Sequence, residues 1–298
     1  MTPTIRQLQY LLALMDERHF GRAADRCYVT QSTFSAGISE LERLLGVTLF
    51  ERTKRKVMPT PLAFDIAERA RRVMLEAEAI VEVAKSQTEG LSGPLRLGLI
   101  PTIGPFLLPQ VEAAIRDAFP ALKLYLREDQ TARLLDQLAV GELDALILAF
   151  PYDAPGTEHV LFGEDPMWLV CPPDHPLAQQ SVISVDQVPR EDLLLLEDGH
   201  CLRDHALAAC HLALGARSGA VQGTSLYTLV QMVANGLGVT MVPQIAVDSP
   251  MFATCDVTFR PLSADSAPRY LGLTWRSTTA REAAFHDFAK VLERALAG

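Results

Sequence analysis

The sequence predicts an N-terminal all-α winged helix-turn-helix domain, a linker helix and an α/β body of two Rossmann-like subdomains. Three observations support this fold class. Two helical patterns joined by a tight turn open the chain, a long helix with a coiled-coil repeat follows, and short apolar strands then alternate with helices. The expected boundaries are 1–60 for the first domain, 61–90 for the linker and 91–298 for the body, with subdomain I at 91–163 and 268–298 and subdomain II at 164–267.

The composition is that of a globular protein with an uneven charge. Of the 298 residues, 49% are apolar and 21% are charged, and the formal net charge is -9. Residues 1–60 nevertheless hold nine Lys and Arg against six Asp and Glu, so the first domain is suited to local contact with nucleic acid. The sequence contains no run of about 18 apolar residues and no secretory signal pattern, so we expect a cytoplasmic protein without a membrane partner. Five scattered cysteines predict no disulfide framework, and any pair is expected to be transient or redox-sensing.

The first domain has the pattern of a helix-turn-helix. Apolar spacing predicts a helix over 5–16, a short Ala-rich helix over 22–27, and a third helix over 31–45 that starts after Thr30 and stops at Gly46. The third helix presents small polar side chains from its first turn, as insertion into a DNA major groove requires. The DNA-contacting residues expected here are Arg22, Gln31, Ser32, Thr33 and Ser35.

Residues 49–57 are expected to form a hairpin wing with three consecutive cations at its tip. A charge run alone is more often a solvated loop, but directly after a helix-turn-helix it indicates a clamp on DNA phosphates. The expected contacts are Arg52, Lys54, Arg55 and Lys56.

Thr60 and Pro61 are typical of a capped helix start. In the helix that follows, apolar residues recur in alternating steps of four and three, which is a coiled-coil seam. The seam consists of Ile66, Ala70, Val73, Ala77, Ile80 and Ala84. It predicts pairing with a second copy of the chain, although packing on the chain's own body would give the same pattern.

The body alternates strand and helix patterns, which predicts a mostly parallel layered sheet. Strands are expected at 95–100, 122–126, 143–150, 167–171, 193–196, 239–242 and 270–275, and helices at 106–119, 132–140 and 281–296. Two such subdomains usually bind a ligand between them, at the ends of the strands. Thr102 follows the first strand, where its hydroxyl is suited equally to bind a small polar ligand or to cap the next helix.

The most informative stretch holds Cys201 and Cys210, nine residues apart. A helix predicted from Leu202 places Cys201 at or just before its N-terminus, where the helix dipole favours a thiolate, and the cation of Arg203, with His200 when charged, would lower the thiol pKa further. An intact helix separates the cysteines by about 13 Å, whereas a disulfide needs Cα atoms within about 7 Å. Oxidation of Cys201 and its capture by Cys210 would therefore require this helix to unwind.

Two simpler interpretations of this stretch stay open. Cys210 can be a small buried apolar residue, which is how most free cysteines behave. The stretch also offers potential metal ligands, although they do not follow a compact zinc spacing. These ligands are His200, Cys201, His205, Cys210 and His211.

The first domain resembles the LysR-type transcriptional regulators in the segments FGRAA (20–24), TQS (30–32) and LFER (49–52). The resemblance covers the whole chain and implies a body like a periplasmic binding protein. Within this family, LIPTIGP (99–105) and LEDGHCLRD (196–204), together with the second cysteine, look like the OxyR subfamily, whose members sense hydrogen peroxide.

The resemblance implies that Cys201 is the peroxidatic cysteine and Cys210 the resolving one, in a reversible disulfide that controls oxidative-stress genes. It implies a polar peroxide pocket formed by Thr102, Thr131, His200, Arg203, Asp204 and Arg269. It also implies a homotetramer, built as a dimer of dimers, on double-stranded promoter DNA. Further partners that it implies are RNA polymerase and a resetting thiol reductant such as glutaredoxin or thioredoxin. Neither a cofactor nor a metal is expected, and the protein would consume one peroxide per switching event without being an enzyme in the turnover sense.

One departure from the family pattern lies in the recognition helix, where residues 36–40 include no Arg or Lys. We therefore expect the wing cations to supply more of the phosphate contact. The competing interpretations are a LysR-type regulator of a small organic ligand in the interdomain cleft, a thiol peroxidase or thiol-disulfide oxidoreductase, and a metal-responsive regulator.

Overall fold

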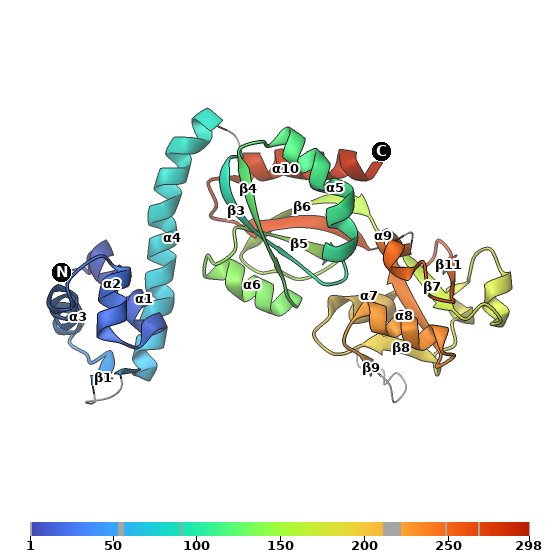
Figure 1. Ribbon diagram of the computed structural model, residues 1–298, viewed down its shortest axis with the longest axis horizontal. Helices are drawn as coiled ribbons and strands as arrows, with labels where there is room; N and C mark the ends of the chain where they lie inside the picture. The colour runs from blue at the N-terminus through green and yellow to red at the C-terminus, as the bar shows by residue number, and fades with distance from the viewer. Residues whose placement is uncertain are drawn as a thin grey trace. The chain divides into compact units, whose positions relative to one another are not determined.

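The chain forms two units, Met1–Thr88 and Glu89–Gly298 (Figure 1). The computed structural model describes residues 2–52, 57–89, 91–210, 222–247, 249–267 and 269–297. The expected wing tip with Lys54, Arg55 and Lys56 lies outside these ranges, as does His211.

The first unit contains the expected helix-turn-helix. Its elements are α1 (Ile5–Glu17), α2 (Phe20–Arg26), α3 (Gln31–Leu45), β1 (Phe50–Arg52), β2 (Val57–Pro59) and α4 (Pro61–Glu89). The Thr30 hydroxyl accepts a hydrogen bond from the Thr33 backbone N–H at 3.3 Å, and Gly46 ends α3 with a left-handed φ of 69°. Both predicted ends of the recognition helix are therefore confirmed, and β1 pairs antiparallel with β2 as expected for a wing.

The recognition helix α3 packs closely on α1 through Gly37. A Cβ atom at this position would lie 2.6 Å from the ring of Tyr10, closer than real contacts allow. The Phe34 ring lies 4.8 Å from the Tyr10 ring, and Ile38 is fully buried beside it. Close packing thus explains why position 37 of α3 cannot hold Arg or Lys, because any side chain there would displace α1.

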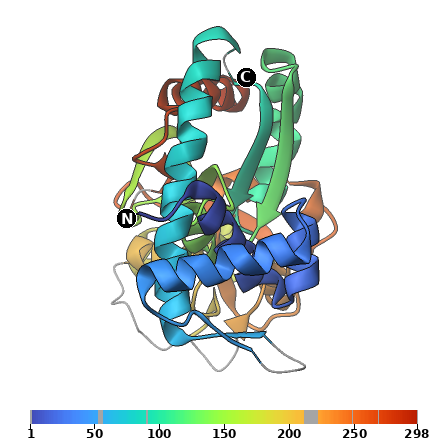
Figure 2. The same cartoon turned by 90° about the vertical axis from the view of Figure 1, so that its left-hand side faces the viewer.

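Helix α4 continues well beyond the three helices of the first unit (Figures 1 and 2). Its coiled-coil seam divides into two parts. Ala70 is buried in the core of the first unit and Ile66 packs against that core, whereas Val73 and Ile80 are 44% and 73% exposed. Packing on the helix-turn-helix of the first unit therefore accounts for the first part of the seam, and Val73 and Ile80 of the second part are exposed apolar residues. The side chain of Ala84 lies outside the description.

The second unit is built on two sheets. The first has the strand order β4-β3-β5-β12-β6 and the second β11-β7-β10-β8-β9. The strands are β3 (Gly93–Leu99), β4 (Leu122–Glu128), β5 (Ala145–Phe150), β6 (Thr157–Glu164), β7 (Met167–Cys171), β8 (Leu193–Leu196), β9 (Gln222–Gly223), β10 (Val239–Pro243), β11 (Thr258–Pro261) and β12 (Tyr270–Arg276).

The prediction of mostly parallel sheets is wrong, because both sheets are mixed. Strand β3 pairs in parallel with β4 and β5, whereas β12 is antiparallel to β5 and β6. In the second sheet β10 is parallel to β8 and antiparallel to β7. The antiparallel pairs arise where the chain passes directly between the sheets, without a crossover helix to restore its direction.

Helices cover the two sheets. In the first sheet α5 (Gly104–Ala118) and α10 (Glu282–Ala297) lie on one face and α6 (Thr131–Ala139) on the other (Figure 1). The second sheet is accompanied by α7 (Cys201–Ala209), α8 (Leu226–Ala234), α9 (Gln244–Val247) and short 3₁₀ turns at Pro176–Gln179, Val185–Gln187 and Pro250–Phe252. Among the described helices, none is both long and apolar enough to cross a bilayer.

Several elements of this unit were not predicted from the sequence: β6, β9, β11, α8 and α9. Strand β6 lies at a sheet edge and is mostly exposed, so it lacks the apolar alternation by which strands are recognised.

Candidate functional site

Helix α7 begins at one cysteine and ends beside the other. Cys201 is its first residue, after His200 as N-cap, and Cys210 is its C-cap. The predicted helix start is confirmed, and the intact helix keeps the two cysteines apart, with both thiols free. Gly199 precedes the cap with φ of 97°, a conformation that favours glycine.

Cys201 lines a small cavity where three strand ends meet. The other lining residues are Ile100, Pro101, Thr102, Gln130, Thr131 and His200, which follow β3, β4 and β8. The walls of this cavity stand too close together for a water molecule, so any ligand must displace a lining side chain. Pockets for drug-sized ligands measure about 300–1,000 Å³, so even after such a displacement this site suits only a very small molecule.

Arg269 connects this cavity to a buried ion pair. The Arg269 side chain is 1% exposed, and its Nη2 donates to the Thr102 hydroxyl at 3.4 Å. Its Nε lies 3.3 Å from a carboxylate oxygen of Asp165, which is also 1% exposed. The structure therefore brings Thr102, Thr131, His200 and Arg269 together around Cys201, as the family resemblance implied.

Two residues expected in this polar pocket lie elsewhere. Arg203 donates to the Leu196 carbonyl at 3.2 Å and pairs with Asp198 at 3.1 Å, so it ties α7 to the preceding turn. Asp204 is exposed to solvent. The position of Arg203 follows from helical geometry, because a residue two places after Cys201 points away from the face that Cys201 occupies.

The electrostatics of Cys201 differ from the prediction. Burial raises the pKa of its thiol above the ordinary value, while the charge of Arg269 and the hydroxyl of Thr131 act to lower it. Arg203, the cation expected to lower the pKa of Cys201, is not among the groups that favour its thiolate. The cation that does so is Arg269. The Thr131 hydroxyl is itself buried without a hydrogen-bond partner in the part of the chain that the structure describes.

Cys210 lies in a different environment. Its sulfur is 3.8 Å from the sulfur of Met241, in the core of the second sheet, whereas Cys201 belongs to the core of the first sheet. Burial raises the pKa of the Cys210 thiol to about 11. The two cysteines of one helix are thus embedded in two separate hydrophobic cores.

Sequence reasoning missed Gln130, Asp165 and Tyr152 around this site, and named His205 only as a potential metal ligand. Gln130 closes one side of the cavity, since a Cβ atom at Gly199 would lie 3.0 Å from its side-chain oxygen. Asp165 neutralises Arg269, His205 bonds the backbone of another segment, and the Tyr152 hydroxyl has its pKa raised by burial and by the charge of Cys201. Gln130 lies two residues before the helix predicted at 132–140.

Metal binding finds no geometric support in this region. Among the residues that the structure describes, no group of three or more His, Cys, Asp or Glu side chains is placed to hold a metal ion.

The predicted DNA face of α3 is partly preorganised. Gln31, Ser32 and Thr33 are exposed and Ser35 is half-buried. The hydroxyls of Ser32 and Thr33 lie 3.0 Å and 2.9 Å from that of Thr30, which orients the first turn of the helix. The side chain of Arg52 lies outside the description, as do the other wing cations.

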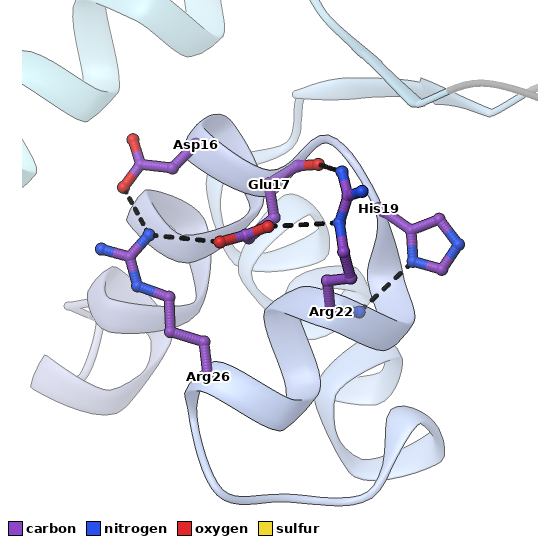
Figure 3. Close-up of polar contacts among 5 residues, drawn as sticks. All are labelled: Asp16, Glu17, His19, Arg22 and Arg26. Carbon is purple, nitrogen blue, oxygen red and sulfur yellow. Dashed lines mark hydrogen bonds and ion pairs between the residues drawn. The ribbon is translucent and has the colours of Figure 1, made fainter.

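Arg22 is held at the start of α2 by acidic and backbone groups (Figure 3). Its guanidinium donates to the Glu17 carbonyl oxygen at 2.6 Å and pairs with the Glu17 carboxylate at 3.2 Å. His19 caps the same helix by accepting from the Arg22 backbone N–H at 3.3 Å, and Arg26 pairs with Asp16 at 2.9 Å. The Arg22 side chain is nevertheless 66% exposed, so it is accessible to a phosphate.

Comparison with known proteins covers both units. Residues 5–63 match the family described as bacterial regulatory helix-turn-helix protein, lysR family, and residues 88–297 match the LysR substrate binding domain. The chain is 40% identical over 294 residues to the DNA-binding transcriptional dual regulator OxyR of Escherichia coli K12, covering 99% of this chain and 96% of that protein.

Solved structures agree with the sequence relatives. Full-length OxyR of Pseudomonas aeruginosa, with a cysteine-to-aspartate substitution, superposes with a TM-score of 0.80 at 37% identity and covers 98% of both chains. Corynebacterium glutamicum OxyR, a cysteine-to-serine mutant with bound hydrogen peroxide, gives a TM-score of 0.68 at 33% identity, covering 100% of this chain and 94% of that one.

Proposed function

Because this chain belongs to the LysR family of bacterial helix-turn-helix regulators, we propose that it regulates transcription in response to hydrogen peroxide through Cys201 and Cys210. The observation that supports this most strongly is the placement of the two thiols at opposite ends of one intact helix, in two different cores. A bond between them requires α7 to unwind and at least one of the two thiols to leave its core. One oxidation event would thereby rearrange the whole second unit.

The chemistry uses the groups around Cys201. Its thiolate attacks one peroxide oxygen, the O–O bond breaks, and the departing hydroxide takes a proton from solvent, which leaves a sulfenic acid. Arg269 and Thr131 both favour negative charge at this sulfur. The thiol of Cys210 then attacks the Cys201 sulfur and water leaves, and a thiol reductant such as glutaredoxin or thioredoxin restores both thiols.

The size of the cavity favours peroxide over an organic effector at this position. The cavity is lined by Thr102, Thr131 and His200 and has no room for a water-sized molecule until a lining side chain moves, so it would admit an oxidant of two oxygen atoms more readily than an organic molecule. A LysR-type regulator of an organic anion would need a larger space around a similar set of donors.

The first unit would bind double-stranded promoter DNA as part of a dimer or tetramer. The exposed seam residues Val73 and Ile80 on α4 are apolar positions that a second copy would cover. Activation of oxidative-stress genes through RNA polymerase would follow from a change in the spacing of the DNA-binding units.

The decisive experiment adds near-stoichiometric hydrogen peroxide to the reduced full chain, alkylates the remaining thiols and maps the disulfides by mass spectrometry. We expect a rapid, dominant Cys201–Cys210 bond. The Cys210→Ser variant should instead accumulate a sulfenic acid at Cys201, trapped by a dimedone probe, while Cys171→Ser should behave as the unsubstituted chain. If both thiols stay reduced while the protein still binds DNA, the peroxide-sensing function is excluded.

A second experiment concerns the DNA contact of Arg22. Replacing it with Gln should remove about one phosphate contact and so weaken binding to promoter DNA. The negative slope of log affinity against log salt concentration should become shallower by about 0.9. Arg116→Gln, which removes an exposed cation on α5 of the second unit, is the matched control and should leave that slope unchanged.

A further inference from the structure

One buried histidine of α7 takes no part in the peroxide chemistry described above. His205 lies one helical turn after Cys201, so the two side chains share a face of α7. It is 7% exposed, which is unusual for an imidazole unless its polar atoms are satisfied. Its position between the two cysteines places it in the segment that must unwind.

His205 makes one hydrogen bond across the second unit. Its Nε2 lies 3.0 Å from the carbonyl oxygen of Pro151, which follows β5 of the first sheet. Since a carbonyl only accepts, the imidazole must carry its proton on Nε2. The bond therefore connects α7, which follows strand β8 of the second sheet, to the end of strand β5 in the first sheet.

The other ring nitrogen has no hydrogen-bond partner among the residues that the structure describes. Nδ1 of His205 is buried without a hydrogen bond to any described residue. In the neutral ring this atom is an acceptor, and leaving it unbonded costs less than burying a second N–H⁺ donor there. The site thus tolerates the neutral ring and opposes the charged one.

We propose that His205 is a positioning residue that latches α7 to Pro151 in the thiol state, and that release and protonation of this imidazole favour the disulfide state. The inference rests on the proposed function. In the latched state Cys201 is held over the peroxide cavity, and unwinding toward Cys210 breaks the His205–Pro151 bond and exposes the ring to water. The released imidazole of His205 can then accept a proton, which makes the dithiol–disulfide equilibrium depend on pH.

The charges around His205 support this coupling. Burial lowers the pKa of His205 to about 4, and the charge of Arg269 adds to the effect against the opposing Pro151 carbonyl. The other titratable groups that face this region are Cys201 and Asp204 on α7, Tyr152 next to Pro151, and Asp165 behind Arg269. A released ring would regain an ordinary pKa of about 6.5.

The direction of the pH effect follows from linkage. The latched state is stabilised relative to the released state above pH 6.5, and this advantage is lost as the pH falls from about 6.5 toward 4, because only the released ring takes up a proton. Lowering the pH from 7.5 to 5.5 should therefore shift the equilibrium toward the disulfide by about tenfold through His205 alone.

The test measures the Cys201–Cys210 dithiol–disulfide equilibrium of the full chain in glutathione buffers at pH 5.5 and 7.5, by alkylation and mass spectrometry. His205→Gln retains an N–H donor for Pro151 but does not titrate. When the pH is lowered from 7.5 to 5.5, we expect the disulfide-to-dithiol ratio of the unsubstituted chain to rise about tenfold more than that of His205→Gln. His205→Ala, which removes the donor, should favour the disulfide about fivefold already at pH 7.5.

A matched control and an independent measurement complete the test. His286→Gln replaces a histidine that is 44% exposed on α10 and should retain the full pH effect. Hydrogen–deuterium exchange at the imidazole C2 position of the unsubstituted chain, resolved at His205 by mass spectrometry, should show titration near pH 6.5 in the disulfide form only. An equal pH response in the unsubstituted chain and His205→Gln, or ordinary titration in the thiol form, would overturn the inference alone. Absence of any Cys201–Cys210 bond at either pH would overturn the proposed function and this inference together.

Discussion

The two ends of α7 offer the same residue type two different environments. Cys201 and Cys210 are 5% and 2% exposed, and burial raises the pKa of both thiols. Near Cys201, however, stand a buried guanidinium and a threonine hydroxyl, which favour the thiolate. Cys210 faces apolar side chains and the sulfur of Met241, and the cation that lowers its pKa is the exposed Arg190.

The difference shows what makes a buried thiol responsive. A helix N-terminus favours a thiolate only modestly, by an effect worth typically 0.3–1 kcal/mol, and here burial outweighs it. The groups that make the surroundings of Cys201 differ from those of Cys210 come from other parts of the chain. Arg269 lies just before β12, and Thr131 is the first residue of α6. Reactivity is therefore assigned by tertiary contacts and not by helix position.

The largest effect on this contrast is expected from Arg269→Met. The substitution removes the cation near Cys201 and leaves the Asp165 carboxylate buried without its partner, which should lower the free energy of unfolding by about 3–5 kcal/mol. Chemical denaturation of the reduced protein measures this. Arg116→Met, which removes an exposed ion pair with Glu112, should change stability by less than about 1 kcal/mol. Equal losses of unfolding free energy in the two variants would show that the buried ion pair contributes no more to stability than the exposed one.

The next largest effect concerns the alkylation of Cys210. With its pKa raised to about 11, the fraction of Cys210 present as thiolate at pH 8.5 is about a hundredfold below that of an ordinary cysteine. Iodoacetamide labelling followed by mass spectrometry should therefore be slow at this site, and should become faster as the pH rises toward 11 or when urea unfolds the chain. Rapid labelling of Cys210 in the folded protein at pH 8.5 would contradict its assigned environment.

A smaller effect is expected from Thr131→Val. The isosteric change removes the hydroxyl that favours the Cys201 thiolate, so the rate of oxidation by peroxide should fall about tenfold. Thr131→Ser, which retains the hydroxyl, should restore most of the rate, and the slow alkylation of Cys210 should be unchanged in both. Stopped-flow measurement of peroxide consumption tests this, and an unaltered rate in Thr131→Val would remove this hydroxyl from the mechanism.

The smallest effect concerns Asp204. Its negative charge raises the pKa of Cys201 but is exposed to solvent, so Asp204→Asn should increase the thiolate fraction of Cys201 by only about twofold at low salt. The gain should shrink as the ionic strength rises, which alkylation rates at two salt concentrations would show. A gain that is independent of salt would indicate a structural effect in place of a charge effect.

The elements with strong local patterns were predictable. The ends of α3 follow from Thr30 and Gly46, and strands β7 and β8 coincide with short apolar runs bounded by polar residues. The start of α7 at Cys201 follows from apolar spacing in the same way. Such features depend on a few neighbouring residues, so one chain segment is sufficient to specify them.

The features that failed or were missed depend on distant parts of the chain. Arg203 is only two residues from Cys201, yet helical geometry turns it toward Leu196. The family resemblance, and no local pattern, placed Arg269 near Cys201, and nothing in the sequence indicated that Asp165 would neutralise it. The antiparallel course of β12 likewise depends on where the chain returns from the second sheet.

The sequence by itself therefore determined the helix-turn-helix, the alternating body and the spacing of two cysteines along one helix, because these are properties of local periodicity and covalent distance. The tertiary structure alone decided which thiol meets a cation, which thiol is enclosed in an apolar core, and which carbonyl His205 binds. The physical reason is that pKa values and buried hydrogen bonds depend on the groups that folding brings within a few ångströms, and those groups are far apart in the chain.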